Sequence, residues 1–77
     1  MELDPTDPRI LKELVTLTMP FGKYQGRLLV DIPEDYLLWL QRKGFPGGRL
    51  GQQLALLYEI RLNGLESLLT PLRPDRH

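Results

Sequence analysis

The stretch IPEDYLLWLQRKG, residues 32–44, holds the start, the body and the end of one α-helix. Pro33 suits the first turn of a helix. Glu34 and Asp35 place negative charge at the helix start, where the helix dipole favours it, and two basic residues close the last turn. Gly44 is a typical helix stop. The segment therefore predicts a helix that opens at Asp31-Ile32-Pro33 and ends at Gly44.

Two further helices are predicted on either side of this one. Asp7 can cap a helix that starts at Pro8 and runs to about Leu17. A third helix is predicted from near Arg49 to about Asn63, followed by one or two helical turns from Leu65 to Thr70. Apolar residues recur along the third helix at helical spacing and form its main stripe: Leu50, Leu54, Leu57, Tyr58 and Leu65.

The segment between the first two helices is predicted to form a β-hairpin. Thr16 to Phe21 is expected to be one strand, and because Pro20 donates no backbone hydrogen bond it belongs at an edge. The loop Gly22 to Gly26 has a glycine at each end, and Arg27 to Val30 is the expected returning strand. The predicted fold class is therefore α+β: a short helix, a hairpin, and two longer helices packed on it.

Trp39 is predicted to be buried between the hairpin and the third helix. It shares one face of the second helix with Tyr36, Leu40 and Lys43, and Leu37 flanks that face. A tryptophan at helical spacing between leucines is usually part of the core.

The composition suits one small domain, expected over residues 1–77 with an ordered core of about 6–70 and a tail from 71 to 77. The chain has 77 residues, 42% of them hydrophobic, and a net charge of zero. It has no cysteine, which removes disulfides and thiolate metal sites. The polar start at Met1 is unlike a signal peptide, and no apolar run reaches the length of a membrane span, so we expect a cytoplasmic protein without a membrane partner.

No residue pattern indicates an enzyme. The phosphate-binding loop GxxxxGK[ST], HExxH and CxxC are all absent from the sequence. His77, the single histidine, ends the expected tail, whereas a catalytic histidine needs a fixed position and an orienting partner. Glu34 and Asp35 are explained by helix-start electrostatics, and Ser67 has no neighbouring base. We therefore expect no catalytic residue, metal ligand or cofactor.

The loop in Pro20–Arg27 is the most informative part of the chain. Backbone amides of a glycine-bounded loop can form an anion-binding nest. Lys23 and Arg27 can neutralise phosphates, and Tyr24 can stack on a base. The structural alternative is that the glycines only serve the turn and that both charges are solvated.

Two features of the third helix leave alternatives open. Arg61 projects close to the middle of the apolar stripe, and it can extend its charge to solvent, pair with Glu34 or Asp35, or bind a ligand. Leu56 and Ile60 widen the apolar arc beyond that of an ordinary surface helix. The widened arc favours a homodimer or another docked partner.

Three segments together resemble a known bacterial family. They are Met19-Pro20-Phe21-Gly22-Lys23-Tyr24-Gln25-Gly26-Arg27, then residues 32–40, then Leu54-Ala55-Leu56-Leu57-Tyr58-Glu59. Over about residues 16–65 the pattern resembles the family labelled "putative quorum-sensing-regulated virulence factor". A shorter form, FGKxKG followed by PxxYxxW, resembles the small C-terminal domain of exonuclease X-type DNA-processing proteins, where it accompanies a nuclease domain.

No nuclease carboxylate cluster accompanies the motif of the second resemblance, so the role that this resemblance implies is binding rather than cleavage. The resemblance covers the following positions: Phe21, Gly22, Lys23, Gly26, Pro33, Tyr36 and Trp39. Gln25 departs from the lysine often found there. The sequence thus leads to a non-enzymatic module that binds single-stranded nucleic acid weakly through Lys23, Tyr24, Arg27 and Lys43, with a homodimeric protein-interaction module as the alternative.

Overall fold

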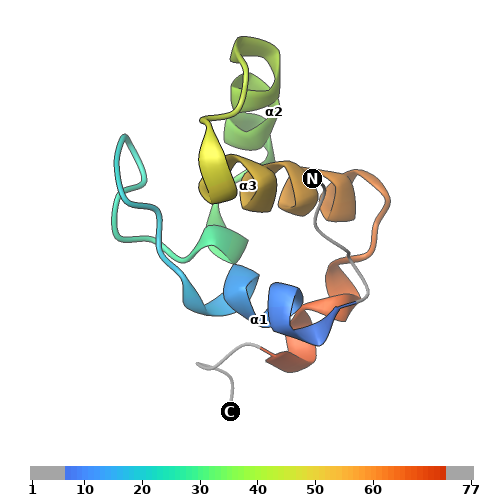
Figure 1. The fold of residues 1–77 in the computed structure, drawn as a ribbon. Helices are drawn as coiled ribbons and strands as arrows, with labels where there is room; N and C mark the ends of the chain where they lie inside the picture. Colours follow the sequence, from blue (N-terminus) through green and yellow to red (C-terminus); the bar gives the residue numbers. More distant parts are fainter. Residues whose placement is uncertain (1–6, 73–77) are drawn as a thin grey trace.

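Three α-helices form the body of residues 7–72, the part of the chain that the computed structural model describes (Figure 1). They are α1 (Pro8–Thr16), α2 (Glu34–Lys43) and α3 (Gly48–Leu62). The predicted helices are confirmed within a residue or two at each end. The helical turns expected after α3 are the 3-10 segments η2 (Glu66–Leu68) and η3 (Thr70–Leu72). None of the helices in residues 7–72 is long and apolar enough to cross a membrane.

The helix ends follow from local chemistry. The Asp7 carboxylate accepts a hydrogen bond from the Arg9 amide at 2.9 Å and caps α1, whose first residue is Pro8. Gly44 ends α2 at φ 103°, a conformation that side chains disfavour, and its amide donates to the Leu40 carbonyl at 2.7 Å. Of the tail expected from residue 71, residues 73–77 lie outside the described residues.

The predicted β-hairpin is wrong, and with it the α+β class. Within residues 7–72 the chain forms no strand, only one antiparallel bridge between Thr18 and Leu28. On one side Pro20 has no amide to extend the pairing. On the other side the chain turns at once into the 3-10 segment η1 (Leu29–Asp31), where the Asp31 amide donates to the Leu28 carbonyl at 2.9 Å. The fold of the described residues is therefore all-helical, with one long loop.

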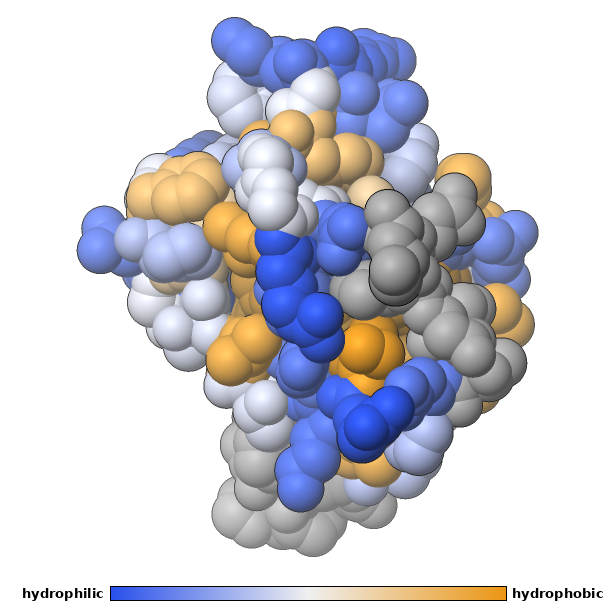
Figure 2. Space-filling view, viewed as in Figure 1, coloured by the Kyte–Doolittle hydropathy of each residue, from blue (hydrophilic) through white to orange (hydrophobic). Residues whose placement is uncertain are grey.

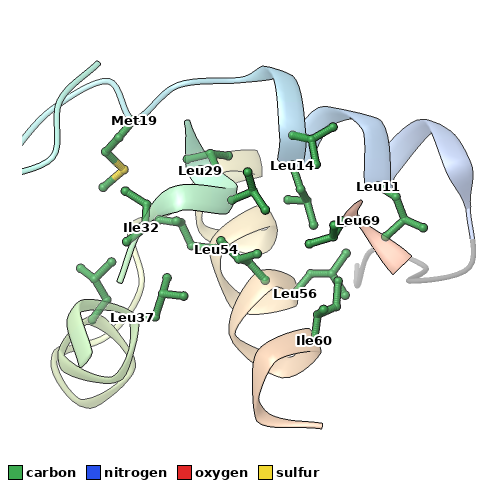
Figure 3. Close-up of a cluster of buried hydrophobic side chains, with 14 residues drawn as sticks. Leu11, Leu14, Met19, Leu29, Ile32, Leu37, Leu54, Leu56, Ile60 and Leu69 are labelled. Atoms are coloured by element: carbon green, nitrogen blue, oxygen red, sulfur yellow. The ribbon is translucent and has the colours of Figure 1, made fainter. Parts of the chain in front are cut away.

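The core lies where α1, η1, α2 and α3 meet (Figure 3). Leu14, Leu29, Leu37 and Leu54 each come from a different one of these elements and are fully buried. Leu56 and Ile60 are also buried, beside Leu69, which follows η2 (Figure 3). The apolar arc of α3 is wide because α3 contacts core residues on several sides, so Leu56 and Ile60 do not support a homodimer.

Arg61 ties α3 to the segment between η1 and α2. Its guanidinium donates hydrogen bonds to the backbone carbonyls of Val30 and Ile32. Burial lowers the pKa of Arg61, and the charges of Glu66, Glu34 and Asp31 oppose that shift. Arg61 thus supplies donors to two carbonyls that regular secondary structure leaves open, a partner that the sequence did not indicate.

Candidate nucleic-acid interface

A groove of about 590 Å³ separates the loop after α1 from the first turns of α2. The loop wall is formed by Gly22, Lys23 and Tyr24. The helix wall is formed by Asp35, Tyr36 and Trp39. In Figure 1 this loop projects from the body of the molecule. The volume lies in the range of sites that bind small organic groups.

Three aromatic rings follow one another along the groove. The ring centroids of Tyr24 and Tyr36 lie 4.9 Å apart, edge to face at 76°. Those of Tyr36 and Trp39 lie 5.5 Å apart and the rings are stacked at 25°. These geometries are favourable for aromatic pairs. Tyr24, Tyr36 and Trp39, named here the aromatic ladder, therefore join the loop wall to the helix wall.

Trp39 is not a core residue, and its predicted burial is wrong. Its side chain is 49% exposed, whereas Leu37 and Leu40 of the same helix are buried. Leu37 and Leu40 lie one position after Tyr36 and Trp39, about 100° around the helix. Two neighbouring apolar stripes thus compete for the core, and the leucine stripe occupies it. The tyrosine and tryptophan stripe faces the groove instead.

Three cations surround the aromatic ladder. Lys23 Nζ and Arg27 Cζ each lie 5.5 Å from the centroid of the Tyr24 ring. Lys43 Nζ lies 5.1 Å from the centroid of the Trp39 ring. All three side chains are exposed, within the range of cation–π attraction. The structure thus brings the predicted residues Lys23, Tyr24, Arg27 and Lys43 to one region.

Not every basic residue belongs to this region. Arg49 at the start of α3 instead donates to both carboxylate oxygens of Glu13 on α1, at 3.0 Å. On the face shown in Figure 2, hydrophilic side chains cover the C-terminal end of α2, and apolar patches interrupt the hydrophilic surface elsewhere. The cations beside the groove are therefore a local feature and not part of a uniformly basic face.

The loop wall is held by its own backbone. Gly26 donates to the Met19 carbonyl and Met19 to the Arg27 carbonyl, both at 2.8 Å. The amides of Gln25 and Arg27 donate to carbonyls within the loop, at 3.2 and 3.0 Å. These internal bonds use the amides of residues 25–27, which are therefore unavailable for the predicted anion-binding nest. None of these bonds uses the amides of residues 22–24, so a backbone nest in this loop is limited to those amides.

Gly22 brings the two walls together. Its φ is 81°, which favours glycine, and a β-carbon added there would lie 3.2 Å from the Tyr36 hydroxyl oxygen. Gly26 also has a positive φ, of 87°, but a β-carbon there would meet no atom within 4 Å. The two glycines that the sequence assigned to one turn thus have different roles.

Asp35, Tyr36 and Trp39 are the groove residues that sequence reasoning did not assign to a site. The YxxW spacing was a usable signal, because residues three apart lie on one helix face. The Asp35 carboxylate makes no hydrogen bond or ion pair with residues 7–72, so it is available to a ligand. Within those residues, no group of three or more metal-ligating side chains comes together.

Comparison with known proteins identifies relatives of this chain. It is 48% identical over 64 residues to "Uncharacterized protein YpeB" of Escherichia coli (strain K12), covering 82% of this chain and 89% of that protein. The protein of the same name from Escherichia coli O157:H7 matches to the same extent. No solved structure matches the chain significantly. The family model for "Putative quorum-sensing-regulated virulence factor" matches residues 7–72, which include the loop, α2 and α3, and the chain belongs to that family.

Proposed function

We propose that this chain is a non-enzymatic accessory module that binds single-stranded nucleic acid through the groove between the loop and α2. The observation that carries the proposal is the aromatic ladder flanked by Lys23, Arg27 and Lys43. Sites for single strands combine aromatic rings, on which bases stack, with cations that follow the backbone.

The arrangement suits unpaired bases better than a duplex. Base stacking on Trp39 requires a base whose face is open, which a double helix does not offer. The Lys43 ammonium beside the Trp39 ring is on a long, exposed side chain. A stacked base can therefore displace it, and the ammonium is then close to the phosphate of the same nucleotide.

The expected affinity is modest. The net charge of the chain is zero, so attraction to a polyanion comes from the three local cations and not from the whole molecule. Each phosphate that a cation neutralises is expected to change the logarithm of affinity by about 0.7 per tenfold change in salt for a single strand. We expect micromolar affinity at low salt and a steep loss as salt rises.

Two readouts of the unmodified protein test this proposal. Fluorescence anisotropy of labelled single- and double-stranded oligonucleotides measures binding at low salt. Trp39 is the only tryptophan in the chain and lies in the groove, so its fluorescence reports a ligand there directly. The double substitution Lys23→Ala/Arg27→Ala should reduce the salt slope without unfolding the domain. Tyr24→Ala should cost about 1–3 kcal/mol of binding free energy if a base stacks on the ring.

The matched control is Arg9→Ala/Lys12→Ala. It removes the same charge from exposed positions on α1, outside the groove. Equal loss of binding in the two double variants would mean that only total charge matters. The absence of both anisotropy and Trp39 changes at high micromolar protein would contradict the proposal.

The alternative of a homodimeric interaction module has lost the observation that favoured it, because Leu56 and Ile60 are part of the domain's own core.

A further inference from the structure

We infer that the groove prefers a guanine base over the other bases of a single strand, an inference that rests on the proposed function. The argument comes from the two charged side chains that line the groove from opposite walls. Lys23 belongs to the loop wall, and Asp35 belongs to the helix wall. A base held between them meets a cation at one edge and a carboxylate at another.

A carboxylate in a nucleic-acid site is an unusual feature, because it repels phosphates. An ionised aspartate only accepts hydrogen bonds, so it selects bases that present donors. Asp35 is exposed, and its carboxylate makes no hydrogen bond or ion pair with residues 7–72. Glu34 beside it does not line the groove, so the groove contains one carboxylate at a defined position.

Guanine matches this charge pattern better than the other bases. Its N1–H and N2–H donors lie side by side and fit the two oxygens of a carboxylate. Its O6 and N7 acceptors lie at another edge and are frequent partners of lysine and arginine. Adenine and cytosine each offer one amino group, and the single donor of thymine lies between two carbonyls that a carboxylate repels. The expected order of affinity is guanine first, adenine and cytosine next, and thymine last.

The aromatic ladder is compatible with a guanine preference but is not its source. Stacking on Trp39 and Tyr36 positions any base in the groove and has little sequence preference of its own. Discrimination is therefore expected from the edges of the base, which Asp35 and Lys23 contact, while the rings supply general affinity. This division predicts that preference and affinity respond to different substitutions.

The test compares thymine twelve-mers that carry one central guanine, inosine, adenine, cytosine or thymine, by anisotropy and by Trp39 fluorescence. We expect the guanine strand to bind on the order of tenfold more tightly than the all-thymine strand. Inosine lacks the N2 amino group and should lose most of that preference. Asp35→Asn should abolish the preference and strengthen the binding of the all-thymine strand, because it removes a negative charge that repels the phosphates.

Glu34→Gln is the matched control, since it removes a neighbouring carboxylate that lies outside the groove. It should keep the guanine preference intact. Equal binding of all five strands would overturn this inference and leave the proposed function standing. Failure of every strand, including all-thymine, would overturn both. Proline-rich peptides also dock on aromatic grooves, and a Trp39 response to such a peptide alone would overturn both as well.

A free nucleotide is the other source of a guanine base. Guanosine monophosphate as a competitor distinguishes a free nucleotide from a guanine within a strand, because only a strand can add backbone contacts to Arg27 and Lys43. Competition at concentrations well above the strand's own dissociation constant supports recognition within a strand. Competition at equal concentrations would overturn the strand as the ligand.

Discussion

Gly22 and Gly26 allow the shape of the groove to be separated from strain in the loop. Both have positive φ, so alanine at either position should cost about 1–2 kcal/mol of folding stability. Only at position 22 does the added β-carbon approach the Tyr36 hydroxyl, at 3.2 Å. We therefore expect Gly22→Ala to shift Tyr36 and, through the stacked rings, Trp39.

The measurement is Trp39 emission and near-ultraviolet circular dichroism of the folded variants, beside urea unfolding. Gly22→Ala should change both spectra, and Gly26→Ala should change stability alone. Equal spectral changes in the two variants would show that Gly22 has no special contact with the helix wall.

Gly51 controls how closely α3 approaches the turn before it. A β-carbon at position 51 would lie 1.7 Å from the Pro46 carbonyl oxygen, a distance that no rearrangement of a flexible side chain can relieve. Alanine is the better helix former by about 1 kcal/mol, yet we expect Gly51→Ala to destabilise the fold by roughly 1–3 kcal/mol, because the turn must move. Urea unfolding measures this difference. Gly47→Ala is the control, since a β-carbon there meets open space and φ is −72°. If Gly51→Ala is no less stable than Gly47→Ala, the close approach of Gly51 to Pro46 is contradicted.

At the level of elements, the helices could be predicted from the sequence, but whether two segments pair as β-strands could not. Asp7, Pro8 and Gly44 mark helix ends through their own backbone chemistry, which needs no tertiary contact. The hairpin depended on whether Leu28 continues an extended strand, and the chain instead turns into η1, which contributes Leu29 to the core. Burial of that leucine is a tertiary effect and leaves no local pattern.

Of the candidate site, the sequence could predict the loop wall but not the helix wall, because the helix wall depends on tertiary packing. Lys23, Tyr24 and Arg27 share one loop, so their proximity follows from the sequence. To predict the helix wall, one must know which of two adjacent stripes of α2 is buried in the core. Trp39 was assigned to the core because a tryptophan at helical spacing between leucines usually belongs there, and its 49% exposure beside the fully buried Leu37 excludes that assignment.

At the scale of the whole molecule, a polar cluster joins α1 to α3. Glu13 accepts hydrogen bonds from Arg49 at 3.0 Å and from Gln53 at 2.9 Å, 36 and 40 residues along the chain. Gln53 is 3% exposed, so its amide depends on this partner. The hydrogen bond from Arg49, and then that from Gln53, lowers the pKa of Glu13 below its ordinary value.

This lowered pKa predicts a loss of stability in acid. The pKa of Glu13 is lower in the folded than in the unfolded chain, so its contribution is fully present above about 4.5 and is lost as pH falls through the folded value. Glu13→Gln keeps an acceptor for both partners but cannot titrate. Urea unfolding from pH 7 downward should show a steeper decline for the wild type than for Glu13→Gln, while Asp7, whose pKa is also lowered, affects both equally. Parallel declines would contradict the role of Glu13.

The two walls of the groove are expected to differ in their local stability. Its helix wall is anchored by Leu37 and Leu40, so the amides of α2 should exchange with solvent only when much of the fold opens. Its loop wall is closed at the base by the Met19–Arg27 and Gly26–Met19 hydrogen bonds, and Met19 is its buried anchor. We expect the opening of those two bonds to disrupt the aromatic ladder without unfolding the domain. The apparent affinity for any ligand is therefore proportional to the fraction of molecules whose loop is closed. A ligand held by both walls would protect the loop amides from hydrogen exchange and leave the exchange of the α2 amides unchanged.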